Sequence, residues 1–174
     1  CLSRIIKQKG IIELMKSAKM IKEQFPYAEF ILVGDIDNFN KSKIKINEIN
    51  KYYKYVKYIS FKDDVRKFII ECDCFVLPSY REGTSRSLLE AASMGKPIVT
   101  TNVPGCNNIV IDNYNGYLCK EKDVISLFNS LKKMLLTEYK LRVKMGQNSR
   151  VKVMKEFDIN IINKKILKEI DIDA

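Results

Sequence analysis

The stretch Pro78-Ser79-Tyr80-Arg81-Glu82-Gly83-Thr84-Ser85-Arg86-Ser87-Leu88-Leu89-Glu90-Ala91 carries the pattern that decides the fold. The apolar run before it, Cys74 to Leu77, is typical of a buried strand, and Ser85 to Met94 has the spacing of a helix. A short loop therefore joins a strand to a helix. Glu82 lies in that loop, and Glu90, eight positions later, lies inside the helix.

The amino end of this helix is a candidate anion site. The first N–H groups of a helix have no partner within it and lie at the positive end of its dipole, so the amides from Gly83 to Arg86 suit a diphosphate. The glycine lets a ligand approach the backbone closely, and Thr84 and Ser85 add two hydroxyls. With about 1.5 Å of rise per helical residue, Glu82 and Glu90 flank such phosphates. The loop therefore suits a sugar nucleotide, with one carboxylate for a hexose and the other for a ribose.

Outside this stretch the chain alternates between strand-like and helical segments. We expect strands at Cys1–Ser3, Phe30–Val33, Val56–Ser60, Cys74–Leu77, Ile98–Thr101 and Gly116–Cys119, and helices at Ile11–Gln24, Ser42–Lys51, Asp64–Cys72, Ser85–Met94, Asn107–Ile111, Val124–Leu136, Glu138–Glu156 and Asn160–Ile170. The alternation predicts an α/β fold with a Rossmann-like, doubly wound parallel sheet and C-terminal helices. Ligands of such sheets bind at the carboxyl ends of the strands. Four candidate residues follow predicted strands and should share that edge: Arg4, Lys9, Gly34 and Glu82.

Ordered motifs along the chain resemble the C-terminal half of the retaining glycosyltransferases of the GT-B fold, family 4, whose mark is a Glu-x7-Glu pair. The matching segments are 78–91, Gly95–Val99, Asn115–Leu118, Leu32–Asp35, and Ser3–Gly10, which is similar to the family's Arg-Leu-x-x-x-Lys-Gly loop. The variant Glu-Gly-x-Ser-Arg-x-Leu-Leu-Glu-Ala is similar to bacterial enzymes that add UDP-linked hexoses or N-acetylhexosamines to lipid-linked glycans. The resemblance therefore implies one half of a GT-B fold.

The resemblance also implies roles for individual residues. Arg4 and Lys9 would hold the donor diphosphate, Glu82 would face the hexose, and Glu90 would face the ribose. The expected catalytic residues are Glu82, Arg4 and Lys9, and the expected donor-binding residues are Arg4, Lys9, Gly34, Gly83, Thr84, Ser85, Leu89 and Glu90. The donor is expected to be a UDP-sugar, transferred with retention and without a metal or other cofactor.

Two other patterns could indicate a metal. Asp35-Ile36-Asp37 has the Asp-x-Asp form that holds Mg²⁺ or Mn²⁺ in a different glycosyltransferase fold. Here it follows Gly34, where GT-B relatives have a glycine-rich turn, and Arg4 and Lys9 already supply positive charge. Cys72-x-Cys74 would be half of a zinc site, but the sequence has no second pair at the required spacing and no histidine. We therefore predict no metal, and reduced thiols in a cytosolic protein.

The chain carries a net charge of +10, and its densest basic stretch, Lys41 to Lys57, mixes six lysines with tyrosines. Such a stretch could bind nucleic acid or an anionic membrane. Because the whole chain is rich in Lys, Ile and Asn, a solvated surface is the default interpretation. Peripheral contact with the inner face of the cytoplasmic membrane is the preferred alternative, and we expect no nucleic-acid partner.

The length suits one domain over residues 1–174. No run approaches 18 apolar residues and no signal peptide is visible, so we expect a cytoplasmic location. The chain begins with Cys1 shortly before the Arg4 loop, so we expect most of the first strand and an N-terminal acceptor domain to be missing. We expect the fragment alone to be inactive. A non-catalytic nucleotide-binding module is the alternative function.

Overall fold

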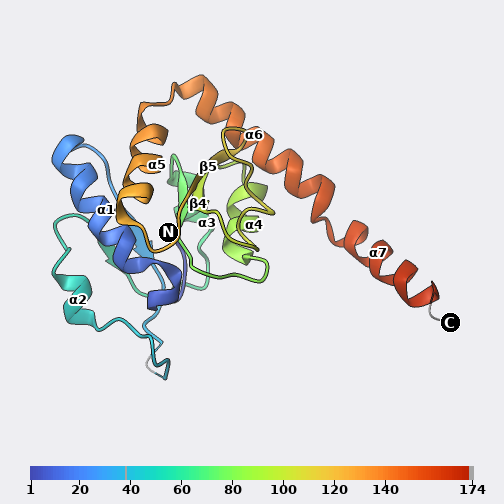
Figure 1. The fold of residues 1–174 in the computed structure, drawn as a ribbon, viewed down its shortest axis with the longest axis horizontal. Helices are drawn as coiled ribbons and strands as arrows, with labels where there is room; N and C mark the ends of the chain where they lie inside the picture. The colour runs from blue at the N-terminus through green and yellow to red at the C-terminus, as the bar shows by residue number, and fades with distance from the viewer. Residues whose placement is uncertain (38, 173–174) are drawn as a thin grey trace.

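The computed structural model describes residues 1–37 and 39–172, and it has the expected alternation of helices and strands (Figure 1). The strands are β1 (Ile31–Val33), β2 (Lys57–Ile59), β3 (Phe75–Leu77), β4 (Ile98–Thr101) and β5 (Gly116–Cys119). The helices are α1 (Ile11–Gln24), α2 (Ile46–Asn50), α3 (Arg66–Glu71), α4 (Arg86–Ser93), α5 (Val124–Leu136), α6 (Tyr139–Glu156) and α7 (Ile159–Ile172), with a 3-10 turn η1 (Lys7–Lys9) before α1. The predicted α/β class with parallel strands and C-terminal helices is confirmed.

The described strands pair only in parallel, but they form two sheets instead of the single one predicted. β1 pairs with β2, and β3, β4 and β5 pair in that order. The predicted strand Cys1–Ser3 is not part of either sheet, and Leu2 forms an isolated parallel bridge with Val33 of β1.

Helices cover both faces of the sheets, as expected for a doubly wound fold (Figure 1). Strand residues alternate between two buried clusters because successive side chains of a strand point to opposite faces. Val76 and Val99 pack with α1 and α5 in one cluster, whereas Phe75, Leu77 and Ile98 pack with α3 and α4 in the other. Each sheet face therefore buries its own apolar layer.

The helices that pack on the first face follow simple sequence signals. α1 buries its apolar residues at helical spacing, with Ile11, Leu14 and Met15 at most 2% exposed. It ends just before Pro26, which lacks an N–H for a further helical bond. α5 begins where the carboxylate of Asp123 accepts a hydrogen bond from the Ser126 N–H at 2.9 Å.

Two predicted helices differ from the structure. The segment predicted as a helix near 107–111 forms turns, because the buried Asn115 side chain accepts from the Ile111 N–H at 2.7 Å and donates to the Ile109 C=O at 3.0 Å. The helix predicted from Ser42 starts later, at Ile46, because the Asn40 side chain accepts from the Ser42 N–H at 2.9 Å in a local turn.

The C-terminal helices lie on the side of α4. α6 packs against α4, whereas α7 extends away from the body (Figure 1). Among the described residues, no helix combines the length and the apolar composition needed to cross a bilayer.

Candidate functional site

The candidate site is centred on a junction between two segments far apart in the sequence: the turn Gln8–Gly10 and the loop Pro78–Glu82. The Gln8 carbonyl accepts hydrogen bonds from the Tyr80 N–H at 2.8 Å and from the hydroxyl of the fully buried Ser79 at 3.1 Å. These bonds hold η1, which precedes α1, against the loop that follows β3. Lys9 and Glu82 are thereby brought together.

Lys9 and Glu82 form an ion pair within this junction. The Lys9 Nζ donates to the Glu82 Oε1 at 2.5 Å, and the side chains are only 18% and 10% exposed. The attraction between opposite charges is stronger here than on an open surface because little water screens it. The structure therefore places the two predicted residues together, but paired with each other, which the sequence did not indicate. A diphosphate at this point would share the lysine with Glu82.

The loop after β4 supports the junction through Gly105, a residue that sequence reasoning did not assign to the site. Gly105 has a φ of 81°, and a Cβ atom there would lie 2.0 Å from the Gly83 carbonyl oxygen. Only glycine permits this approach. The adjacent Cys106 is fully buried, and burial raises the pKa of its thiol, with a further contribution from the charge of Glu82. The Pro104-Gly105 dipeptide was the available signal, and by itself it indicated only a turn.

The amino end of α4 lies beside this junction and remains open. Ser85 occupies the N-cap position, yet no side chain caps the helix. The Ser85 hydroxyl is buried and lies 3.4 Å from the Ser87 hydroxyl. Gly83 and Thr84 are exposed, and no heavy atom lies within 4 Å of where a Gly83 Cβ would stand. The first-turn amides of α4 are therefore free of side-chain caps, which suits an anion, and binding of a ligand there stays a prediction.

Glu90 lies outside the junction, in a hollow of about 480 Å³ that Asp63, Asp64 and Arg66 also line. Its side chain is exposed, and its carboxylate has no hydrogen-bonded or ionic partner among the described residues. Arg66 pairs with Asp64 at 2.8 Å, and this hydrogen bonding lowers the pKa of Asp64 to about 2. The hollow thus presents free carboxylate oxygens, which suit the hydroxyls of a sugar.

The neighbouring Leu89, also predicted at the site, is half-buried and packs against the apolar cluster that contains α3 and α4. In the structure, the Leu89 side chain contributes to the packing of this cluster. A contact between Leu89 and a ligand stays a prediction.

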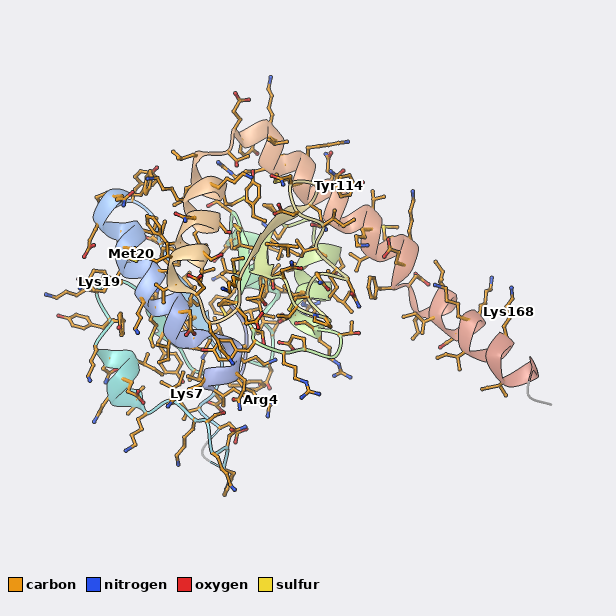
Figure 2. All side chains as sticks on the ribbon, viewed as in Figure 1. Arg4, Lys7, Lys19, Met20, Tyr114 and Lys168 are labelled. Atoms are coloured by element: carbon orange, nitrogen blue, oxygen red, sulfur yellow. The ribbon has the colours of Figure 1, made fainter. Side chains whose placement is uncertain are left out.

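Arg4 forms an ion pair of its own, separate from the pair of Lys9 and Glu82. Its Nη1 donates to the Asp37 Oδ2 at 3.2 Å, and the arginine side chain is 64% exposed. Figure 2 labels Arg4 and Lys7, which belong to the stretch that precedes α1. Asp37, which belongs to the Asp-x-Asp pattern, is therefore paired with an arginine. In the part of the chain that the structure describes, no three or more His, Cys, Asp or Glu side chains lie together where they could hold a metal ion.

Gly34, the remaining predicted residue, packs directly beneath the Arg4 loop. Its N–H donates to the Ile59 C=O at 3.1 Å, and its own carbonyl accepts from the Tyr58 hydroxyl at 3.0 Å. A Cβ at this position would lie 1.8 Å from the Ser3 carbonyl oxygen. Packing against Ser3 accounts for the glycine, and its contact with a ligand stays a prediction.

Tyr80 fixes the loop of Glu82 to α1. Its hydroxyl donates to the Glu13 Oε2 at 2.7 Å, and the Lys122 Nζ lies 5.3 Å from the ring centroid. Burial raises the pKa of Tyr80, and the hydrogen bond to the negatively charged Glu13 raises it further. A neutral tyrosine therefore stabilises the loop.

Comparison with known proteins gives one family. Residues 1–152 match the family model described as "Glycosyl transferases group 1". The chain is 34% identical, over 98% of its length and 43% of the relative's, to the N,N'-diacetylbacillosaminyl-diphospho-undecaprenol alpha-1,3-N-acetylgalactosaminyltransferase of Campylobacter jejuni. It is 30% identical, over 90% of its length and 40% of the relative's, to the UDP-Gal:alpha-D-GlcNAc-diphosphoundecaprenol alpha-1,3-galactosyltransferase of Escherichia coli. The chain thus spans less than half the length of these relatives.

Solved structures show the same fold. The C-terminal domain of a glycosyl transferase group 1 family protein (LpcC) from Francisella tularensis is 25% identical with a TM-score of 0.78, over 91% of this chain and 85% of that one. Anabaena HepE in complex with UDP gives a TM-score of 0.86 at 23% identity, over 98% of this chain and 47% of that one. The predicted resemblance to one half of a GT-B glycosyltransferase is therefore confirmed.

Proposed function

Because the chain belongs to the group 1 glycosyl transferase family, we propose that it is the donor-binding half of a retaining hexosyltransferase of family 4 that uses a UDP-sugar. The observation that carries the proposal is the junction of Lys9 and Glu82 beside the uncapped amino end of α4. A cation, a carboxylate and free amides meet there. The name of the E. coli relative includes a UDP-sugar, which supports UDP as the nucleotide.

The proposed chemistry is the departure of the donor diphosphate. Lys9, Arg4 and the first-turn amides of α4 would stabilise the negative charge that develops as the glycosidic bond breaks. Glu82 would accept a hydrogen bond from the hexose and hold Lys9 in place, and Glu90 would bind the ribose. Gly83, Thr84 and Ser85 would line the phosphates.

We propose that donor binding requires no dissolved metal. Arg4 and Lys9 would supply the positive charge that a divalent cation supplies in other folds. Asp37 pairs with Arg4 at 3.2 Å, so its carboxylate positions that arginine. The role proposed for Asp37 is therefore indirect.

The acceptor would be a lipid-linked or other glycan of surface polysaccharide biosynthesis, since both named relatives act on undecaprenol diphosphate derivatives. A second domain would bind it. Peripheral contact with an anionic membrane from the cytoplasmic side is part of the proposal, because Lys41, Lys45 and Lys51 are exposed, and so is the aromatic Phe39.

Calorimetry tests the donor proposal. We expect the 174-residue chain to bind UDP more tightly than GDP or ADP, with the same affinity in EDTA and in Mg²⁺. Loss of binding in EDTA would contradict metal independence, and no binding of any nucleotide would contradict the donor site.

Activity of the chain alone tests the need for a second domain. Incubation with UDP-sugars and a polyprenyl-diphosphate-linked glycan, followed by mass spectrometry, should give no extended glycan and at most slow donor hydrolysis. The reason is that exclusion of water and positioning of the acceptor depend on closure against another surface. Robust extension would place the acceptor site within these 174 residues.

A further inference from the structure

The two cations that were predicted to hold the donor diphosphate are each neutralised by a carboxylate in the structure. The Lys9 Nζ lies 2.5 Å from the Glu82 carboxylate, and the Arg4 guanidinium lies 3.2 Å from the carboxylate of Asp37. Each pair has no net charge, whereas the diphosphate of a nucleotide is a polyanion. The proposed donor site therefore needs positive charge from a further side chain.

Arg86 carries a positive charge that no described residue neutralises. It is the first residue of α4, its side chain is exposed, and its guanidinium has no hydrogen-bonded or ionic partner in the described part of the chain. The Cα–Cβ bonds of a helix tilt toward its amino end, so this side chain leaves the backbone in the direction of the uncapped amides. An anion that binds those amides would therefore lie within reach of the guanidinium.

Arg86 also shares a face of α4 with Glu90. Residues four apart lie on the same side of a helix, and four residues advance about 6 Å along its axis. Arg86 and Glu90 form no ion pair in the structure, and Glu90 lines the 480 Å³ hollow together with Ser93. One face of α4 thus presents a free guanidinium and then a free carboxylate, in the order in which a nucleotide presents its phosphates and its ribose.

A positive side chain at the first position of α4 is unfavourable for the helix itself. The amino end is the positive end of the helix dipole, and no acidic residue in the first turn offsets the charge of Arg86. A bound anion would remove this repulsion. The fold therefore does not account for the arginine, whereas an anionic ligand does.

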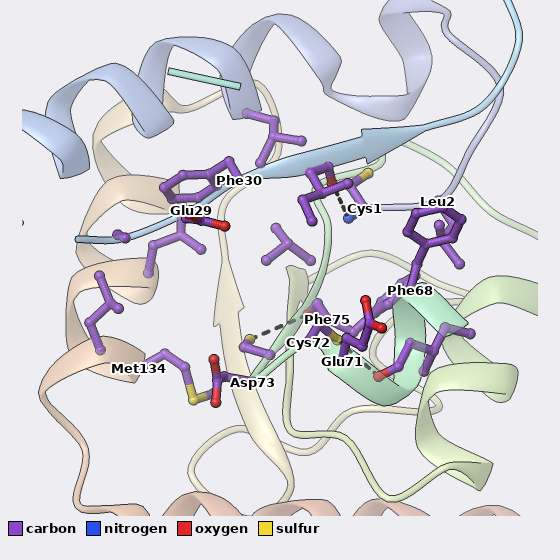
Figure 3. A pocket seen from close by; sticks show the side chains of 18 of the residues that line it. Cys1, Leu2, Glu29, Phe30, Phe68, Glu71, Cys72, Asp73, Phe75 and Met134 are labelled. Carbon is purple, nitrogen blue, oxygen red and sulfur yellow. Dashed lines mark hydrogen bonds between the residues drawn. The ribbon is translucent and has the colours of Figure 1, made fainter. Parts of the chain in front are cut away.

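The hollow of about 500 Å³ that residues of both sheets line has a different electrostatic character. Figure 3 shows the carboxylates of Glu29, Glu71 and Asp73 on its lining. Arg142 also lines it, but its guanidinium donates to the Thr137 carbonyl at the end of α5. A diphosphate is consequently better matched by the amino end of α4 than by this hollow.

We propose that Arg86 is a donor-binding residue, and that its guanidinium donates hydrogen bonds to the diphosphate of the nucleotide. The proposal rests on the proposed function, and it adds a residue to that donor site. The planar guanidinium fits two phosphate oxygens at once, while the first-turn amides bind others. Because the pairs of Lys9 and Arg4 are neutral, Arg86 supplies net positive charge to the site.

Calorimetry with UDP on the wild type, Arg86→Met, Arg86→Lys and Arg81→Met tests the proposal. Arg81 is the matched control, because it is exposed, has no partner among the described residues and lies in the same loop but outside α4. Arg86→Met should bind UDP at least about tenfold more weakly, the scale of hydrogen bonds to a charged group. Arg81→Met should stay within about threefold of the wild type, and Arg86→Lys should fall between the two because it keeps only the charge.

Two further readouts separate a phosphate contact from a structural role. The thermal midpoint of Arg86→Met should not fall, because removing the cation relieves its repulsion by the helix dipole. The affinity of Arg86→Met for UDP should also decrease less with added NaCl than that of the wild type, since one screened attraction is absent.

The double variant Arg86→Met/Glu90→Ala tests whether Arg86 acts on the ligand directly. Independent contacts with the phosphates and the ribose should give losses of UDP affinity that multiply. If Arg86 acted only by orienting Glu90, adding Arg86→Met to Glu90→Ala would cause no further loss.

Three outcomes would overturn the proposal. UDP affinity of Arg86→Met within about twofold of the wild type would show that Arg86 makes no contact. Equal losses in Arg86→Met and Arg81→Met would show a general effect of net charge, and no further loss in the double variant would make Arg86 a positioning residue for Glu90. The wild type still binds UDP in each of these cases, so the proposed function would stand. Absence of UDP binding by the wild type would overturn both.

Discussion

The Lys9–Glu82 junction and the Glu90 hollow each contain a carboxylate, but only the carboxylate of the junction has an ionic partner within the protein. Glu82 is 10% exposed and paired with Lys9, whereas Glu90 is exposed and has no partner among the described side chains. A satisfied carboxylate contributes to the fold, and removing its partner leaves a buried charge. A carboxylate without a protein partner can form such hydrogen bonds with a ligand. Substitutions at the junction should therefore change stability first, and substitutions in the hollow should change binding first.

The largest expected effect is that of Gly105→Ala at the junction. The new Cβ would meet the Gly83 carbonyl at 2.0 Å and stand at a φ of 81°, so we expect a loss of about 2 to 4 kcal/mol in the free energy of unfolding. Urea denaturation measures it. The matched control is Gly83→Ala, where the Cβ meets nothing within 4 Å, and the loss should stay below about 1 kcal/mol. Similar losses in the two variants would refute the close packing.

The second effect is that of Lys9→Met, which leaves Glu82 buried without a partner. We expect the free energy of unfolding to fall by about 1 to 3 kcal/mol, and part of that loss to be recovered in Lys9→Met/Glu82→Gln. As a control, Lys67→Met breaks the exposed pair with Glu71 at 3.9 Å and should cost less than about 0.5 kcal/mol. If both lysine variants unfold at the same urea concentration, the buried pair does not stabilise the junction.

The third prediction compares Glu90→Ala with Glu82→Ala, by UDP binding as well as by stability. Glu90→Ala should weaken UDP binding by about 1 to 3 kcal/mol, the scale of hydrogen bonds to a charged group, and should leave stability unchanged within about 0.5 kcal/mol. Glu82→Ala should do the reverse, because the partner proposed for Glu82 is the hexose, which UDP lacks. Calorimetry with UDP and urea denaturation of both variants separate the two roles, and equal losses of UDP affinity would contradict the division.

The smallest effect concerns Tyr80, whose hydroxyl donates to Glu13 at 2.7 Å. Tyr80→Phe should cost about 0.5 to 1.5 kcal/mol at pH 7. The folded state raises the pKa of Tyr80, so it holds the proton more tightly than the unfolded chain does. This contribution is complete below the unfolded pKa of about 10 and disappears as the pH rises through the folded pKa.

Urea unfolding at several pH values checks the Tyr80 prediction. The difference between the wild type and Tyr80→Phe should be constant from about pH 7 to 9 and should narrow above about 10. Tyr139→Phe, at a ring that is 71% exposed, should show no such dependence. A difference that widens above that pH would reverse the sign of the argument.

The sequence predicted the parts of the site that depend on short motifs. The strand, loop and helix from Cys74 to Met94 occur as β3 and α4, and Glu82 lies just before the helix that contains Glu90. Helix spacing and the order of strands explain this success, since both are local patterns. The assignment of the site residues to a donor stays a prediction.

The parts that the sequence did not predict depend on contacts between distant segments. The pairing of Lys9 with Glu82 spans 73 residues, and the approach of Gly105 to Gly83 joins two separate loops. In both cases the partners belong to separate segments of the chain, so no local pattern could indicate them. Asn115 is different, because its side chain bonds to Ile109 and Ile111, four to six residues away, and the helical spacing of 107–111 gave no sign of this local competition.

The sequence alone was enough to predict the α/β class, the parallel strands and the family, because hydrophobic period, turn residues and motif spacing are local properties. The tertiary structure alone decided which charges are neutralised by the fold and which remain free. Charge pairing depends on distances between segments, and only packing sets those distances.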